Sequence, residues 1–204
     1  MSQLTFVHGT MTSGKTTALL QEAHNFGLHG LNAFLLTAAI DTRSGEGTIR
    51  SRIGISAPAA TFAPDENLFE KIAAMHGLRP IDIVMVDECQ FLSRDQVWQL
   101  SDVVDDLGIR VMCYGLRSDF RGSLFEGSAA LMAIADELRE VTGVCATGAK
   151  ATMVARLDAA GRAMTDGPQV LVGGEETYVA MSRPAWKKAV RAALKETPHQ
   201  LRAV

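Results

Sequence analysis

Residues 9–16, GTMTSGKT, have the spacing of a loop that wraps a phosphate chain. The two glycines permit unusual backbone angles, and successive backbone N–H groups of such a loop face the phosphates. We expect Lys15 to neutralise the β- and γ-phosphates and Thr16 to place its hydroxyl on Mg²⁺. The predicted phosphate-binding residues of the loop are Gly9, Thr10, Met11, Thr12, Ser13, Gly14, Lys15, Thr16 and Thr17.

A second candidate group follows the apolar run IDIVMV, where Asp87 and Glu88 are adjacent. A phosphate loop needs an acidic residue at the end of a buried strand to hold the metal, directly or through water. Asp87 is therefore the predicted Mg²⁺ partner of Thr16. Adjacent strand residues point to opposite sides, so Glu88 need not share this task. The alternative interpretation of the pair is an exposed strand end without chemistry.

Short apolar runs alternate with helical patterns along the first two thirds of the chain. Strands that are apolar throughout and separated by helices predict an α/β fold with a parallel sheet covered on both faces. The predicted strands are 4–9, 32–39, 81–88 and 109–116, and the predicted helices are 15–25, 68–75, 95–107 and 131–138. The glycine-rich stretch 43–60 has little apolar periodicity and predicts a mobile loop.

The pattern changes after about residue 143, where short strands and turn-rich segments predict a small β-rich appendage. Its expected strands are 151–157, 168–174 and 176–181, and a helix over 184–195 closes it. The expected domains are a nucleotide-binding domain over 1–142, the appendage with its closing helix over 143–194, and a tail over 195–204.

Composition excludes several classes of protein. The net charge of −3 argues against broad electrostatic binding to nucleic acid. The first residues do not resemble a signal peptide, and no apolar run approaches the ~18 to 20 residues of a membrane span. Three widely spaced cysteines make a disulfide framework unexpected. These features predict a cytoplasmic protein that binds neither nucleic acid nor membranes.

Five segments, in this order, resemble the cytosolic thymidine kinases of the zinc-lasso (type II) family: GTMTSGKTT, DTRSGEGTIRSRIG, VDECQFL, YGLRSDFRG and VGGEETYV. The resemblance implies a P-loop (RecA-like) sheet with a C-terminal lasso domain. It implies transfer of the γ-phosphoryl group of ATP to the 5′-hydroxyl of thymidine or deoxyuridine. It also implies feedback inhibition by thymidine triphosphate and a homotetramer. A kinase of another deoxynucleoside and a non-catalytic nucleotide-binding protein are the alternatives.

The same resemblance assigns roles to particular residues. Glu88 takes the position of the general base that accepts the proton of the 5′-hydroxyl. Asp41 and Arg43 match a pair near the phosphates and metal. The residues implied in nucleoside binding are Met11, Phe91, Leu116, Phe120, Arg121, Phe125, Leu171, Val172, Gly173, Gly174 and Tyr178.

The zinc site of this family is degenerate here. The four ligand positions hold Cys145, Thr147, Ser182 and Ala185, so one sulfur remains of the four expected ligands. Structural zinc needs about four ligands in a tetrahedral array, and we therefore expect no structural zinc. Hydrogen bonds from the two hydroxyls are expected to help replace the metal. The expected packing residues are Val144, Met181 and Trp186.

Overall fold

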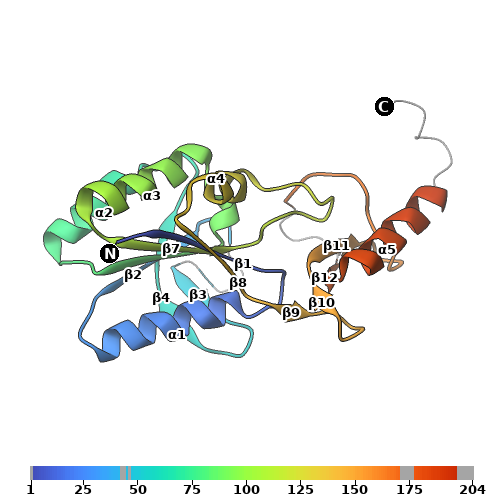
Figure 1. The fold of residues 1–204 in the computed structure, drawn as a ribbon, viewed down its shortest axis with the longest axis horizontal. Helices are drawn as coiled ribbons and strands as arrows, with labels where there is room; N and C mark the ends of the chain where they lie inside the picture. The colour runs from blue at the N-terminus through green and yellow to red at the C-terminus, as the bar shows by residue number, and fades with distance from the viewer. Residues whose placement is uncertain (1, 42–44, 46, 171–176, 197–204) are drawn as a thin grey trace. The chain divides into compact units, whose positions relative to one another are not determined.

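The computed structural model describes residues 2–41, 45, 47–170 and 177–196 (Figure 1). Contacts divide the chain into two compact units. Unit 1 comprises residues 1–9, 14–117 and 125–141, and unit 2 comprises residues 10–13, 118–124 and 142–204. Among the described residues, no helix is long and apolar enough to cross a membrane. The expected division into domains at residue 142 stays a prediction.

Unit 1 is built on a six-stranded sheet in the order β5-β2-β6-β7-β1-β8, in which every neighbouring pair is parallel. The α/β prediction is confirmed, as are the four strands expected from apolar runs. The strands of the sheet are β1 (Leu4–His8), β2 (Ala33–Ala38), β5 (Ala60–Phe62), β6 (Ile83–Asp87), β7 (Arg110–Gly115) and β8 (Glu137–Glu140).

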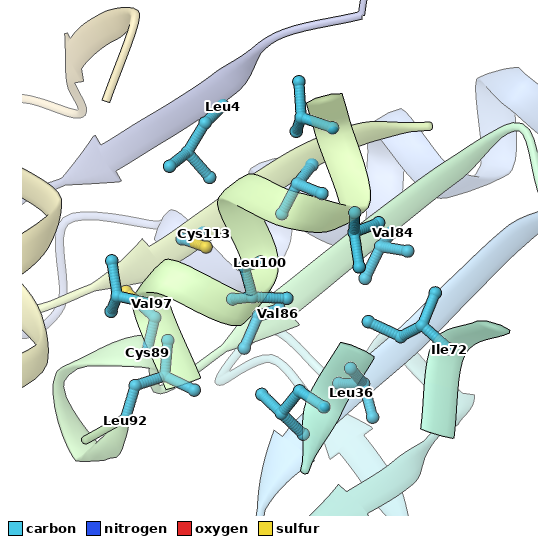
Figure 2. Packing of buried hydrophobic residues seen from close by; sticks show 14 of the residues in the cluster. Leu4, Leu36, Ile72, Val84, Val86, Cys89, Leu92, Val97, Leu100 and Cys113 are labelled. Atoms are coloured by element: carbon cyan, nitrogen blue, oxygen red, sulfur yellow. The ribbon is translucent and has the colours of Figure 1, made fainter. Parts of the chain in front are cut away.

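Strand β6 shows why these strands are apolar throughout. Val84 and Val86 pack into one hydrophobic cluster, while Ile83 and Met85 pack into a second cluster. Alternate residues of a strand point to opposite faces, so both faces of the sheet are buried. Figure 2 shows the first cluster, in which Leu100 packs with Val84 and Val86.

Helices cover both faces (Figure 1). The first cluster includes residues of α2 (Leu68–Leu78), α3 (Arg94–Leu107) and α4 (Glu126–Ile134). The second includes residues of α1 (Lys15–Leu28). Between β6 and α3 lies a short 3₁₀ helix, η1 (Cys89–Phe91). Ser93 then caps α3, because its side chain accepts from the backbone N–H of Gln96 while the Gln96 side chain accepts from Ser93 N–H.

The helix expected over 131–138 is wrong in its second half. Helix α4 begins earlier and ends at Ile134, and residues 137–140 form the edge strand β8. Asp136 lies between α4 and β8 and attaches the chain to the start of β1. Its backbone N–H donates to the Leu4 carbonyl, and its carboxylate accepts from Leu4 N–H at 2.7 Å. The side chains of β8 are mostly exposed, so the strand carries no apolar alternation that the sequence could show.

The stretch expected to be a loop over 43–60 contains an antiparallel hairpin. Its strands are β3 (Thr48–Arg50) and β4 (Ser56–Pro58). Ile49 of β3 is buried in the second hydrophobic cluster, and Ala57 and Ala59 pack against that cluster, so a few apolar contacts hold a segment of otherwise weak periodicity. Residue 60 already belongs to strand β5 of the main sheet. Residues 42–44 and 46 lie outside the described part.

The described residues of unit 2 form two short antiparallel strand pairs and a helix. Strand β9 (Gly143–Val144) pairs with β10 (Lys150–Ala151), and β11 (Met153–Leu157) pairs with β12 (Thr177–Met181). Helix α5 (Arg183–Glu196) follows. The β-rich appendage and its closing helix are confirmed. The strand expected over 168–174 is absent from the described residues 168–170, and its remainder lies outside them.

Candidate active site

The phosphate loop connects the end of β1 to the first residue of α1. Thr12 and Gly14 both have positive φ angles, 64° and 94°, so the chain turns through left-handed conformations that a regular strand or helix lacks. Gly14 stands at the N-cap and has no side chain to cap the helix. The first backbone N–H groups of α1 therefore form a favourable site for an anion.

The structure places Thr16 beside Asp87, the two residues expected to hold Mg²⁺. The Thr16 hydroxyl donates to Oδ2 of Asp87 at 3.1 Å. Asp87 ends β6 and is buried, and this burial, together with the neighbouring Glu88 charge, raises its pKa to about 7. A cation at this position would favour the ionised carboxylate. Both groups belong to unit 1.

Glu88 follows directly and has a left-handed backbone, with φ 53° and ψ 38°. A non-glycine residue in this region stores strain, which the surrounding structure must hold in place. The buried side chain of Gln90 does so by contacting two groups. Its amide Nε2 donates to Oε2 of Glu88, and its Oε1 accepts from the backbone N–H of Leu116 at 2.9 Å. The candidate base is thereby tied to the segment that follows β7.

That segment needs a glycine at its start. A Cβ on Gly115 would lie 2.6 Å from both Cys89 Sγ and Gln90 Oε1, so only glycine allows β7 to approach η1 so closely. Leu116 is then fixed a second time, because its carbonyl accepts from the Ser128 hydroxyl at 2.6 Å. Gln90 of η1 and Ser128 of α4 therefore both position Leu116.

Phe91 and Phe125, two of the apolar residues implied in nucleoside binding, pack edge to face with ring centroids 6.3 Å apart. Both lie in unit 1 with Leu116. Asp41 follows β2 in the same unit, and its backbone N–H donates to the Ala38 carbonyl. Arg43 lies outside the described residues.

In unit 2, Asp119 organises the segment that carries Phe120 and Arg121. The Asp119 carboxylate is buried and accepts from the backbone N–H and guanidinium of Arg121, from Ser123 N–H and from the Gln169 amide. Arg121 therefore forms an ion pair at 3.0 Å within its own turn.

The remaining residues implied in nucleoside binding also belong to unit 2. Met11 is partly exposed in the phosphate loop, and Tyr178 is partly exposed in β12. Residues 171–174, expected to contact the base through their backbone, lie outside the described residues.

The degenerate zinc position holds a small hydrogen-bonded cluster. The Thr147 hydroxyl lies 3.1 Å from Cys145 Sγ. This contact, with backbone N–H groups of Thr147, Ser182 and Ala149, lowers the pKa of Cys145 to about 7. One sulfur and two hydroxyls do not fit a tetrahedral zinc site.

Of the packing residues expected to replace the metal, Val144 is 70% exposed, which contradicts its expected role. Met181 and Trp186 are partly buried.

Sequence reasoning missed three buried polar residues that shape these segments: Gln90, Asp119 and Arg156. Gln90 lies in the motif VDECQFL and Asp119 lies in the motif YGLRSDFRG, so the motifs themselves could have identified these two residues. Arg156 stands in the run MVARL, where its neighbours are apolar and nothing in the sequence marks it.

Comparison with known proteins agrees with this geometry. A family model described as thymidine kinase matches residues 2–186. The chain belongs to the thymidine kinase family. A thymidine kinase of Ruegeria pomeroyi is 54% identical over 189 residues, which cover 93% of this chain and 96% of the relative. Similar proteins of Xanthomonas campestris pv. campestris and Escherichia coli O157:H7, also called thymidine kinase, are each 50% identical over at least 93% of both chains.

Proposed function

We propose that this chain transfers the γ-phosphoryl group of ATP to the 5′-hydroxyl of thymidine, with deoxyuridine as a slower substrate. The observation that carries the proposal is the arrangement at the end of β6, where Glu88 follows the Asp87 that contacts Thr16 of the phosphate loop. Membership of the thymidine kinase family supports the choice of nucleoside.

Different residues of the chain have different roles in the proposed phosphoryl transfer. Lys15 and the first N–H groups of α1 bind the phosphates, and this positioning supplies most of the catalysis. Glu88 accepts the proton of the 5′-hydroxyl as that oxygen attacks the γ-phosphorus, while the bond from the γ-phosphorus to the bridging oxygen breaks and ADP leaves. Gln90 orients the Glu88 carboxylate by holding Oε2.

Thr16 and Asp87 fit a Mg²⁺ ion. The hydroxyl and the carboxylate are oxygen donors already in contact, and Mg²⁺ commonly takes one or two protein ligands together with phosphates and water. When bound, the ion supplies charge neutralisation at the β- and γ-phosphate oxygens. Asp41 and Arg43 are proposed to lie near the same phosphates.

For the nucleoside, we propose contacts from the apolar residues implied by the resemblance and backbone contacts from residues 171–174. A pocket fitted to one methyl group discriminates by only ~1 to 3 kcal/mol, which is why deoxyuridine remains a substrate. Feedback inhibition by thymidine triphosphate, a homotetramer and a cytoplasmic location complete the proposal. The family resemblance supports the first two, and the three unpaired cysteines agree with the third.

Replacing Glu88 by Gln tests the proposed base. Glu88→Gln keeps the size of the side chain and removes its ability to accept the proton, so phosphorylation of thymidine should fall by roughly 10² to 10⁴. Binding of a non-hydrolysable ATP analogue with Mg²⁺ should be unchanged. Glu70→Gln, which changes an exposed residue in the first turn of α2, is the control. Near-normal turnover by Glu88→Gln would remove Glu88 from the role.

A further inference from the structure

Arg156 of β11 is a fully buried arginine, with 0% of its surface exposed. Arginine stays protonated in proteins, and a buried charge is costly unless it is paired or hydrogen-bonded. Within the described part of the chain, no carboxylate forms an ion pair with Arg156. Its partners are instead a ring and two carbonyl groups.

The guanidinium contacts two segments that are distant from it in sequence. Its central carbon lies 3.8 Å from the centroid of the Phe120 ring, the distance of a close cation–π contact. Nη1 donates to the Pro168 carbonyl at 2.8 Å, and Nη2 donates to the Asp166 carbonyl at 3.2 Å. Nε is buried and has no hydrogen-bond partner among the described residues.

The backbone of the turn at residues 166–168 closes over the guanidinium. Gly167 has a φ of 116°, and a Cβ at this position would lie 2.5 Å from Nη2 of Arg156. A side chain at residue 167 is therefore excluded by backbone strain and by collision. The backbone of residues 166–168 therefore packs directly against the guanidinium of Arg156.

Both the ring and the backbone of Phe120 make contacts within unit 2. The ring is 1% exposed and has the guanidinium against it. The Phe120 carbonyl accepts from the indole N–H of Trp186 at 3.0 Å. The guanidinium of Arg121 also lies over this ring, 5.6 Å from its centroid, but Arg121 pairs with Asp119 of the same turn, so Arg156 is the closer cation and the one that comes from another element, β11. All of these residues belong to unit 2.

We propose that Arg156 is a positioning residue for nucleoside binding, which acts by holding the Phe120 ring and the turn at residues 166–168 in one arrangement. The proposal rests on the role in nucleoside binding proposed above for Phe120. One buried cation thus contacts both the Phe120 ring and the backbone carbonyls of the turn.

Steady-state kinetics of Arg156→Met and Arg156→Lys test the proposal. Met removes the charge and every donor, while Lys keeps the charge but lacks the flat face and the forked donors. The KM for thymidine should rise roughly tenfold or more in Arg156→Met and by a smaller factor in Arg156→Lys. The KM for ATP should not change. KM does not depend on the fraction of folded enzyme, so a variant that only loses stability keeps both its thymidine KM and its ATP KM. An unchanged thymidine KM would therefore contradict the proposal.

Arg162→Met is the matched control, because Arg162 is an exposed arginine of the same unit that pairs with Asp158 at 2.9 Å. Its thymidine KM should equal that of the parent. If Arg156→Met does not fold, Arg156→Lys carries the test, and an unchanged thymidine KM in that variant overturns the inference.

A double-mutant cycle with Phe120→Leu separates this inference from the proposed function. If Arg156 acts through Phe120, the effects of Arg156→Met and Phe120→Leu on the thymidine KM are not additive. A raised KM in Phe120→Leu with additive effects overturns the role of Arg156 and leaves the role of Phe120 intact. An unchanged KM in Phe120→Leu removes Phe120 from nucleoside binding and the inference with it. Failure of the parent to phosphorylate thymidine overturns the proposed function itself.

Discussion

At the scale of single residues, Gln90 uses both ends of one buried amide. One end donates to Glu88 and the other accepts from Leu116 N–H. Gln90→Met keeps a similar volume but leaves that N–H without its partner and Glu88 without its donor. Because a positioned base acts only in the chemical step, we expect kcat to fall by roughly 10- to 100-fold while the thymidine KM changes little.

The control for Gln90 is Gln99→Met. Gln99 also accepts a backbone N–H through its Oε1, from Leu68 at 2.8 Å, so both variants lose the same kind of hydrogen bond. Each should lower the free energy of unfolding by about 1–3 kcal/mol, but only Gln90→Met should change kcat. Equal kcat values for the two variants would show that Gln90 stabilises the fold and does not position Glu88.

Cys145 illustrates how neighbouring hydrogen bonds control a thiol. Hydrogen bonds, first that of Thr147, lower its pKa to about 7, whereas burial raises the pKa of Cys89 and of Cys113. Alkylation proceeds through the thiolate, so iodoacetamide should modify Cys145 selectively at neutral pH. The rate should rise through pH 7 and level off about one unit above it. Peptide mapping by mass spectrometry against pH measures this profile.

Thr147→Val tests the cause of that low pKa. Valine has the shape of threonine without the hydroxyl, so the thiolate loses its first stabilising contact. The midpoint of the alkylation profile should move to higher pH, towards the ordinary value of a thiol near ~8.5. An unchanged midpoint would assign the shift to the backbone N–H groups alone.

At the scale of elements, the approach of α4 to η1 depends on a glycine. A Cβ on Gly127 would lie 2.7 Å from the carbonyl oxygens of both Cys89 and Leu92. Backbone atoms cannot rotate away as a flexible side chain can, so Gly127→Ala should destabilise the protein by about 1–3 kcal/mol. Because η1 directly follows Glu88, the same variant should also lose activity. Urea unfolding and a kinase assay measure the two effects.

Gly77 provides the opposite case in α2. A Cβ at Gly77 meets nothing within 4 Å, and alanine favours a helix over glycine by up to ~1 kcal/mol. Gly77→Ala should therefore raise the free energy of unfolding slightly and leave activity unchanged. If Gly77→Ala and Gly127→Ala lowered the free energy of unfolding by similar amounts, that result would contradict the close packing described for Gly127.

The elements also show which parts of the fold the sequence can predict. Strands β1, β2, β6 and β7 are buried on both faces, so continuous apolar runs identify them. Strand β8 lies at an edge with exposed side chains, and its pairing with β1 depends on backbone groups that every residue has. The hairpin β3–β4 escapes prediction for a related reason, because Ile49 is its one large apolar residue in the core and only the small side chain of Ala57 packs beside it.

The same reasoning applies to the candidate site. The spacing of the phosphate loop and the acidic pair at the end of β6 identify Thr16 and Asp87, because each residue belongs to a local motif. Arg156 could not be found in this way. Its partners are a ring at residue 120 and carbonyl groups at residues 166 and 168, and backbone carbonyls carry no sequence signal.

At the scale of the whole molecule, we expect unit 2 to fold without the zinc that is typical of the resembled family. Its small strand pairs are joined by Cys145, Thr147 and the backbone of Ser182, which meet at the degenerate zinc position. Ser182 also accepts from the backbone N–H of Ala185 at 3.5 Å at the start of α5. The four former ligand positions thus remain neighbours although the ligands have changed.

We therefore expect the purified protein to contain no stoichiometric zinc and to keep its melting temperature within about 2 °C after treatment with EDTA. The triple variant Thr147→Cys/Ser182→Cys/Ala185→Cys restores four thiols and should bind one zinc per chain, because the geometry of the position persists. Zinc should then raise its melting temperature, since metal binding adds to folding free energy. The same triple variant with Cys145→Ser is the control and should bind zinc more weakly. Elemental analysis that finds one zinc per chain in the parent would contradict the prediction, whereas a triple variant that binds none would show that the position has lost its geometry as well as its ligands.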